Sequence, residues 1–183
     1  MAVPDCVWTI GHSSRTIEEF LALLHAHRVQ LIADVRRYPG SRRYPHFNAD
    51  ALKASLEAES IGYLPLPQLG GRRKPRADSP HTIWRHESFR GYADYMDTPE
   101  FDVALAVLMD AACERRCAIM CSEALWWQCH RAMIADALKA RGVTVLHIQA
   151  LEQTSEHPYT SAASIVDGKL YYGTGGTGAD SGQ

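Results

Sequence analysis

The chain has 183 residues, of which 46% are hydrophobic and 22% are charged, and its formal net charge is −2. This length suits one domain with a sizeable core, and the charge balance excludes a general attraction to nucleic acid or to an anionic membrane. No segment approaches the roughly 20 apolar residues of a membrane helix, residues 1–6 lack the pattern of a secretory signal, and the five cysteines favour reduced thiols in the cytoplasm.

Alternating apolar segments predict strands and helices in turn. Thr16 is expected to cap the first helix, with Glu19 as the partner three residues later. Proline at the first helical position predicts a helix from Pro99, and Asp167-Gly168 suits a two-residue hairpin turn. The predicted strands are residues 7–10, 31–35, 63–65, 117–121 and 144–148, and the further helices are residues 49–59, 89–96, 99–114 and 129–141.

This order predicts an α/β fold, a three-layer Rossmann-like sandwich with a mostly parallel five-stranded sheet and a C-terminal β-hairpin. We expect a single domain over residues 1–172. Residues 173–183 form a glycine-rich tail that we expect to be disordered.

Polar side chains follow the strands where a parallel sheet binds its ligands, beyond the carboxyl ends. The first strand leads to His12 and Ser13, and the second leads to Asp34 and Arg36. The third precedes Gly70 and Gly71, and the fourth ends at Cys121 with Glu123 two residues later. Their recurrence at one edge of the sheet predicts a single site.

Cys129, His130 and Arg131 stand where the next helix is expected to begin, and a helix N-terminus stabilises anions and thiolates. Cys121 and Cys129 are therefore candidates for thiol chemistry, although free cysteines are often simply buried. The core interpretation is preferred for the other cysteines of this region, Cys113 and Cys117. Cysteines four apart in a strand lie roughly 13 Å apart, which argues against a structural zinc. A metal site with mixed ligands, Cys129, His130, His12 and Glu123, is a weaker alternative. The sequence requires no cofactor.

Two basic loops favour an anionic ligand, because arginine binds phosphate with two parallel hydrogen bonds. One loop carries Arg36 and Arg42, and the other is residues 72–76. Aromatic residues lie close by in sequence, which suits a nucleotide or single-stranded nucleic acid. The alternative is an ordinary solvated loop.

Several short segments carry a resemblance to a known family, namely residues 10–13, 34–36 with 39 and 41–42, 69–71, 89 with 92, 98–101, 121, 123, 129–131, 147–148 and 157–159. In this order they resemble the bacterial domain of unknown function family 488 (DUF488) along almost the whole chain. The resemblance implies that the motif residues form one site, but it brings no activity with it. A looser similarity to rhodaneses and cysteine phosphatases concerns the fold.

The leading hypothesis is an enzyme, a transferase or hydrolase, acting on a phosphorylated, nucleotide or nucleic-acid-derived ligand. Glu123 would be the acid or base with His12 or His130 as its partner, and Arg36, Arg42 and Arg131 would hold the anion. One alternative is rhodanese- or phosphatase-like chemistry at Cys121 or Cys129. The other is a non-catalytic module that binds nucleic acid.

Overall fold

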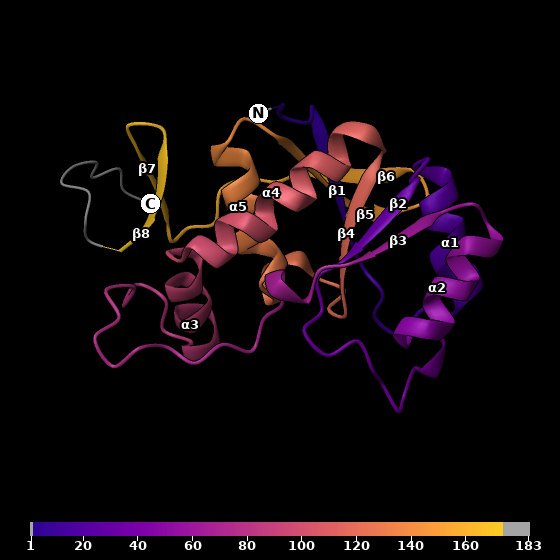
Figure 1. The fold of residues 1–183 in the computed structure, drawn as a ribbon, viewed down its shortest axis with the longest axis horizontal. Coiled ribbons are helices and arrows are strands. Elements are labelled where there is room, and N and C mark those ends of the chain that lie inside the picture. Colours follow the sequence, from indigo (N-terminus) through magenta and orange to yellow (C-terminus); the bar gives the residue numbers. More distant parts are fainter. Residues whose placement is uncertain (1, 174–183) are drawn as a thin grey trace.

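The predicted alternation of strands and helices is confirmed in a computed structural model, which describes residues 2–173 (Figure 1). The elements are β1 (Cys6–Gly11), α1 (Ile17–Ala26), β2 (Leu31–Asp34), α2 (Ala49–Ala58), β3 (Gly62–Pro65), α3 (Glu87–Met96), α4 (Pro99–Glu114), β4 (Cys117–Cys121), α5 (Arg131–Ala140), β5 (Thr144–Ala150), β6 (Gln153–Glu156), β7 (Ala163–Val166) and β8 (Lys169–Tyr172).

The main sheet has six strands in the order β3-β2-β4-β1-β5-β6, and the first five elements of that order run parallel. The predicted α/β sandwich is therefore confirmed, and β6 adds an antiparallel edge strand beside β5 that the sequence did not predict. Strand β6 reads Gln-Thr-Ser-Glu and is largely exposed, so it carries no apolar alternation that could reveal it.

Helices cover both faces of the sheet, α1 and α2 on one side and α4 and α5 on the other. Side chains alternate between the two faces along a strand. In β4, Ala118 and Met120 pack with α1 and α2, whereas Cys117, Ile119 and Cys121 pack with α4 and α5. This alternation directs the last residue of β4 toward the start of α5.

Local signals set the helix starts. Thr16 caps α1 as predicted, and its hydroxyl accepts a hydrogen bond from the Glu19 amide. The predicted start of α5 at Cys129 is two residues early. Cys129 has an extended backbone (φ −141°, ψ 171°), and the helix begins at Arg131. The cysteine therefore precedes the helix and is free to turn back toward β4.

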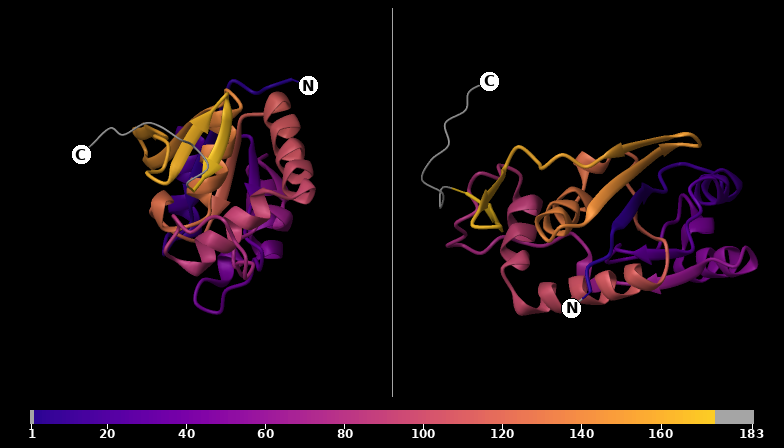
Figure 2. Two further views of the ribbon diagram at one scale, coloured as in Figure 1. Left: turned by 90° about the vertical axis from the view of Figure 1, so that its left-hand side faces the viewer. Right: turned by 90° about the horizontal axis from the view of Figure 1, so that it is seen from above.

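The β7–β8 hairpin confirms the predicted turn, with φ of +51° at Asp167 and +75° at Gly168. It lies at the far end of the molecule from α1 and α2 (Figures 1 and 2). Asp136 of α5 holds this end, because its buried carboxylate accepts hydrogen bonds from the Tyr172 hydroxyl (2.6 Å), the His157 ring (2.7 Å) and the Thr160 amide and hydroxyl.

The predicted disordered tail lies, from residue 174 on, outside the described residues. Within residues 2–173, no helix combines the length and the apolar character needed to span a membrane.

Candidate functional site

The carboxyl ends of β1 and β4 bring two of the predicted segments into contact. The His12 amide donates to the Cys121 carbonyl (2.9 Å), and the Ser13 amide donates to the Ser122 carbonyl (3.0 Å). Strand β2 pairs in parallel with β4 on the side away from β1, so the segment that follows Asp34 begins at the same end of the sheet. Parallel pairing is the physical reason that residues distant in sequence meet here.

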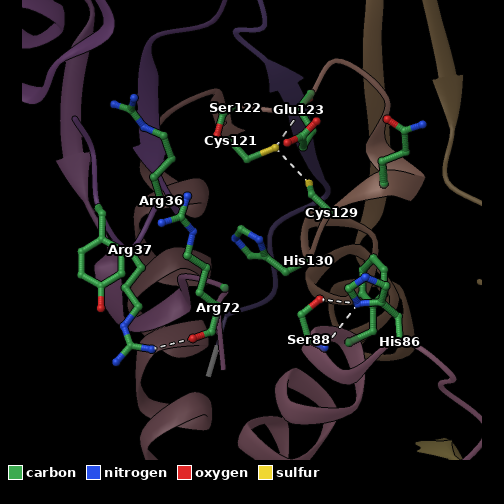
Figure 3. A pocket seen from close by; sticks show the side chains of 14 residues that line it. Arg36, Arg37, Arg72, His86, Ser88, Cys121, Ser122, Glu123, Cys129 and His130 are labelled. Atoms are coloured by element: carbon green, nitrogen blue, oxygen red, sulfur yellow. Dashed lines mark hydrogen bonds between the residues drawn. The ribbon is translucent and has the colours of Figure 1, made fainter. Parts of the chain in front are cut away.

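A pocket of about 300 Å³ opens at this edge (Figure 3). Half of the predicted site residues line it, namely Arg36, Gly71, Cys121, Glu123, Cys129 and His130. The other residues that line it are Arg37, Tyr38, Arg72, His86, Ser88, Phe89, Ser122 and Gln128.

Cys121 and Cys129 form a close pair in this pocket, with 3.0 Å between their sulfur atoms. Cys121 is 2% exposed and Cys129 is 9% exposed. Cys121 faces α5 because of its position in β4, and the extended backbone of Cys129 turns the second thiol toward it. The pair is thus built by a strand end and a helix start.

Arg131 is buried beside the two thiols and is only 2% exposed. Its Nη2 donates to the carbonyls of Glu123 (3.0 Å) and Ala124 (3.2 Å), and its amide donates to the Cys129 sulfur (3.4 Å). Within residues 2–173 its Nε has no hydrogen-bond partner, and its guanidinium forms no ion pair. A buried charge without a counter-charge is costly, so the site favours a negative charge near Arg131.

The Cys121 thiol supplies that negative charge. Burial by itself raises the pKa of Cys121, but the hydrogen bond from Cys129 and the charge of Arg131 outweigh burial and lower the pKa from 9.0 to about 7. The hydrogen bond to Cys121 together with burial raises the pKa of Cys129 well above 9.0. The pair therefore releases one proton near neutrality and retains the other.

Arg36 lines the pocket, but its charge is neutralised within the protein. Its Nε donates to Asp34 Oδ1 (2.9 Å) and its Nη2 donates to Asp34 Oδ2 (2.7 Å), and both residues are buried. The Tyr63 hydroxyl also donates to Asp34 Oδ2 (2.6 Å). The guanidinium of Arg36 is thus held in a fixed orientation and can still donate hydrogen bonds, but the Arg36–Asp34 pair carries little net charge.

His12 lies behind Arg36 and does not line the pocket. Its Nδ1 faces the Ser13 carbonyl (2.9 Å) and must donate to it, so Nε2 is left as an acceptor 3.5 Å from Arg36 Nη1. Burial, with the charge of Arg36, lowers the pKa of His12 to about 4. A neutral His12 therefore orients Arg36.

His130 lines the pocket as a neutral ring. Its Nε2 donates to the Val35 carbonyl (2.8 Å), and burial lowers the pKa of His130 to about 4. Its Nδ1 is left as an acceptor, close to Gly71. A Cβ at Gly71 would lie 2.8 Å from this nitrogen, so glycine is needed to leave room for the ring.

Arg37 and Arg72 carry the uncompensated positive charge of the pocket. Neither forms an ion pair among the described residues. Arg37 Nη1 donates to the Arg72 carbonyl (3.0 Å), and the two guanidinium carbons lie 5.5 Å and 5.8 Å from the ring centre of Tyr38. Tyr38 itself is 62% exposed. Two cations and one aromatic ring thus flank the open side of the pocket.

The remaining predicted residues lie around the pocket without lining it. Asp34 and Arg131 act from behind through Arg36 and the thiols. Gly70 packs against the Arg37 backbone, where a Cβ would lie 2.6 Å from its Cα. Ser13 sits in a turn with φ of +49° next to β1, and Arg42 is exposed on its loop.

Glu123, the predicted acid or base, lines the pocket with an exposed side chain. Its backbone is more constrained than its carboxylate, because the Glu123 carbonyl accepts from Arg131 and lies where a Cβ at Gly11 would be only 1.8 Å away.

His86, Ser88 and Phe89 form one wall of the pocket. The sequence analysis did not single out His86 or Ser88, and it named Phe89 only among the positions of the family resemblance. His86 caps α3, and its Nδ1 lies 2.8 Å from the Ser88 hydroxyl. The start of α3 reaches the pocket through tertiary packing, since a Cβ at Gly91 would collide with the Arg73 carbonyl at 2.1 Å. No local pattern connects this segment to the strand ends.

Comparison with known proteins gave one finding. The family model described as "Domain of unknown function DUF488" matches residues 16–138. The match contains the predicted site residues from Asp34 to Arg131, while His12 and Ser13 precede it. No curated protein and no solved structure matched.

Proposed function

This chain belongs to the DUF488 family, and from that premise we propose that it is an enzyme that binds a small phosphorylated or nucleotide-like ligand and attacks it with the Cys121 thiolate. The observation that carries the proposal is the Cys121 thiol in the pocket wall, beside a buried guanidinium that has no carboxylate partner within residues 2–173. Thiolates are the reactive form of cysteine, and a neighbouring cation stabilises them. Because the number of cysteines is odd, we also propose that the protein works in the cytoplasm, where thiols stay reduced.

The charge of the pocket supports an anionic ligand. Arg37 and Arg72 stand at the opening without carboxylate partners among the described residues, and Arg36 offers donors held in place by Asp34. Arginine donors match phosphate oxygens. Tyr38, exposed beside the two cations, offers an aromatic ring on which a base could stack. A volume of about 300 Å³ is at the lower end of ligand pockets, which favours a small ligand.

In this proposal the thiolate attacks the electrophilic atom of the bound anion and the leaving group departs with its electron pair. Among the described residues Glu123 is the one carboxylate in the pocket wall, and it is the candidate to protonate the leaving group or to activate water afterwards. His130 Nδ1 is a second acceptor on the same wall. Glu123 thus keeps its predicted acid–base role, and Cys121 takes the role of nucleophile.

Alkylation of Cys121 by iodoacetamide across pH tests the thiolate. Protease cleavage after Glu114, Glu123 and Glu152 places Cys121 and Cys129 on different peptides. Fragmentation of the peptide 115–123 in the mass spectrometer then separates a label on Cys121 from one on Cys117. We expect half-maximal labelling of Cys121 near pH 7, and slower labelling when inorganic phosphate or a nucleoside diphosphate is present.

Two variants separate specific protection from a general effect of charge. Arg72→Ala should weaken protection by phosphate, whereas Arg42→Ala should leave it unchanged because Arg42 lies outside the pocket. Labelling with a midpoint near pH 9 and no protection by any phosphate compound would exclude the proposal. Retention of thiolate reactivity with loss of turnover in Glu123→Gln would assign the acid–base step to Glu123.

A further inference from the structure

We propose that Cys121 and Cys129 form a reversible disulfide, so that the pocket also carries out thiol–disulfide exchange with small disulfides. This activity rests on the proposed function in one respect, since the same Cys121 thiolate starts both reactions. It adds a role for Cys129, which the attack on an anionic ligand does not require.

The separation of the sulfur atoms is the first argument. They lie 3.0 Å apart, and a disulfide bond measures about 2.05 Å, so closure requires a movement of only about 1 Å. Seven residues separate the two cysteines, and the stretch that connects them is mostly exposed. The movement can therefore be taken up by that stretch without displacing β4 or α5.

Access is the second argument. Both thiols line the pocket although both are nearly buried, so a reagent small enough to enter can reach them. Cys117 also lies in β4, but it is fully buried and lines none of this pocket. The core position expected for Cys113 is wrong, because Cys113 is exposed on α4, at a separate surface that Cys6 also lines. Within the described residues, Cys121 and Cys129 are the cysteines whose sulfur atoms are in contact.

The exchange balances with a low-molecular-weight disulfide as the oxidant. The Cys121 thiolate attacks one sulfur of the small disulfide, forms a mixed disulfide and releases one small thiolate. Cys129 then gives its proton to solvent, attacks the Cys121 sulfur and releases the second small thiolate. The protein loses two electrons and the small disulfide gains them, and an excess of small thiol reverses both steps. The oxidised protein has no nucleophile, so its reaction with the anionic ligand stops.

Bis(2-hydroxyethyl) disulfide is the probe, used on the full chain. In the wild-type protein we expect the peptides 115–123 and 124–152 to become linked through Cys121 and Cys129, and dithiothreitol to separate them. In Cys129→Ser, the reaction should stop at the mixed disulfide of Cys121 with 2-mercaptoethanol. Because attack by Cys129 is intramolecular, the mixed disulfide should be at least about ten-fold less abundant in the wild type than in the variant.

Cys113 serves as the internal control, since its exposed thiol should form a mixed disulfide in every variant. Cys129→Ala, compared by circular dichroism, repeats the test without a hydroxyl in the pocket. A stable mixed disulfide at Cys121 in the wild type, or an unmodified pair while Cys113 reacts, would overturn the inference. Either outcome leaves the proposed function intact if Cys121 still alkylates with a midpoint near pH 7, so the two failures are distinguishable.

Discussion

Replacing Arg131 with glutamine is the most direct test of how this site ionises its thiol. Arg131 is buried, has no carboxylate partner among the described residues and lowers the pKa of Cys121 against the effect of burial. A pKa of about 7 instead of 9.0 corresponds to a preference for the thiolate of about 3 kcal/mol. Without the cation, burial still raises the pKa of Cys121 and the hydrogen bond from Cys129 still lowers it, so we expect the pKa to rise from about 7 toward 9.

The size of the expected pKa change decides whether the alkylation rate at pH 7 or the midpoint of the pH profile is the better measurement. If the whole shift were lost, the thiolate fraction at pH 7 would fall from about one half to about one hundredth, an upper limit of about 50-fold. Each remaining thiolate would then be more nucleophilic by about 6- to 10-fold, because nucleophilicity rises with pKa. The alkylation rate at pH 7 should therefore fall by at most about 5- to 8-fold. The midpoint of the pH profile is the more sensitive measurement.

Two controls isolate the charge. Arg131→Lys keeps a cation and should keep the midpoint well below that of Arg131→Gln. Arg141→Gln removes a cation from the other end of α5 and should leave the midpoint near pH 7. Thermal melting checks that Arg131→Gln is folded, since it loses hydrogen bonds to two carbonyls. A folded Arg131→Gln protein with its midpoint still near pH 7 would refute the electrostatic argument.

Three further predictions concern stability. Gly11→Ala should lower the free energy of unfolding by about 1–3 kcal/mol in urea denaturation, because the added Cβ meets the Glu123 carbonyl; an unchanged midpoint would show that this backbone contact relaxes freely. Asp136→Ala should cost about 3–5 kcal/mol by leaving its buried donors unpaired, and the melting temperature should fall well below that of the exposed Asp110→Ala control. Stability should decline from about pH 6.5 to pH 4, because His12 and His130 have a folded pKa of about 4 against 6.5 when unfolded, so the unfolded chain binds more protons there. At pH 4 each of the two histidines lowers the free energy of unfolding by on the order of 3 kcal/mol. A flat profile in urea titrations at several pH values would contradict the burial of these rings in the neutral form.

Much of the fold follows from local sequence. The cap at Thr16, the proline start of α4, the Asp167-Gly168 turn and the apolar strands were all predicted, because each depends on residues a few positions apart. The edge strand β6 was missed, since an exposed edge needs no apolar pattern.

The candidate site was likewise predicted in part from the sequence and decided in part by the tertiary structure. The sequence by itself indicated which residues follow the strands, because parallel strands place their carboxyl ends together. Tertiary structure decided which of them act in the pocket: strand order places β4 between β2 and β1, and its alternation turns Cys121 toward Cys129. Long-range contacts also neutralise Arg36 with Asp34 and leave Arg131 without a carboxylate partner among the described residues. Charge compensation depends on distance in space, and no spacing along the chain encodes it.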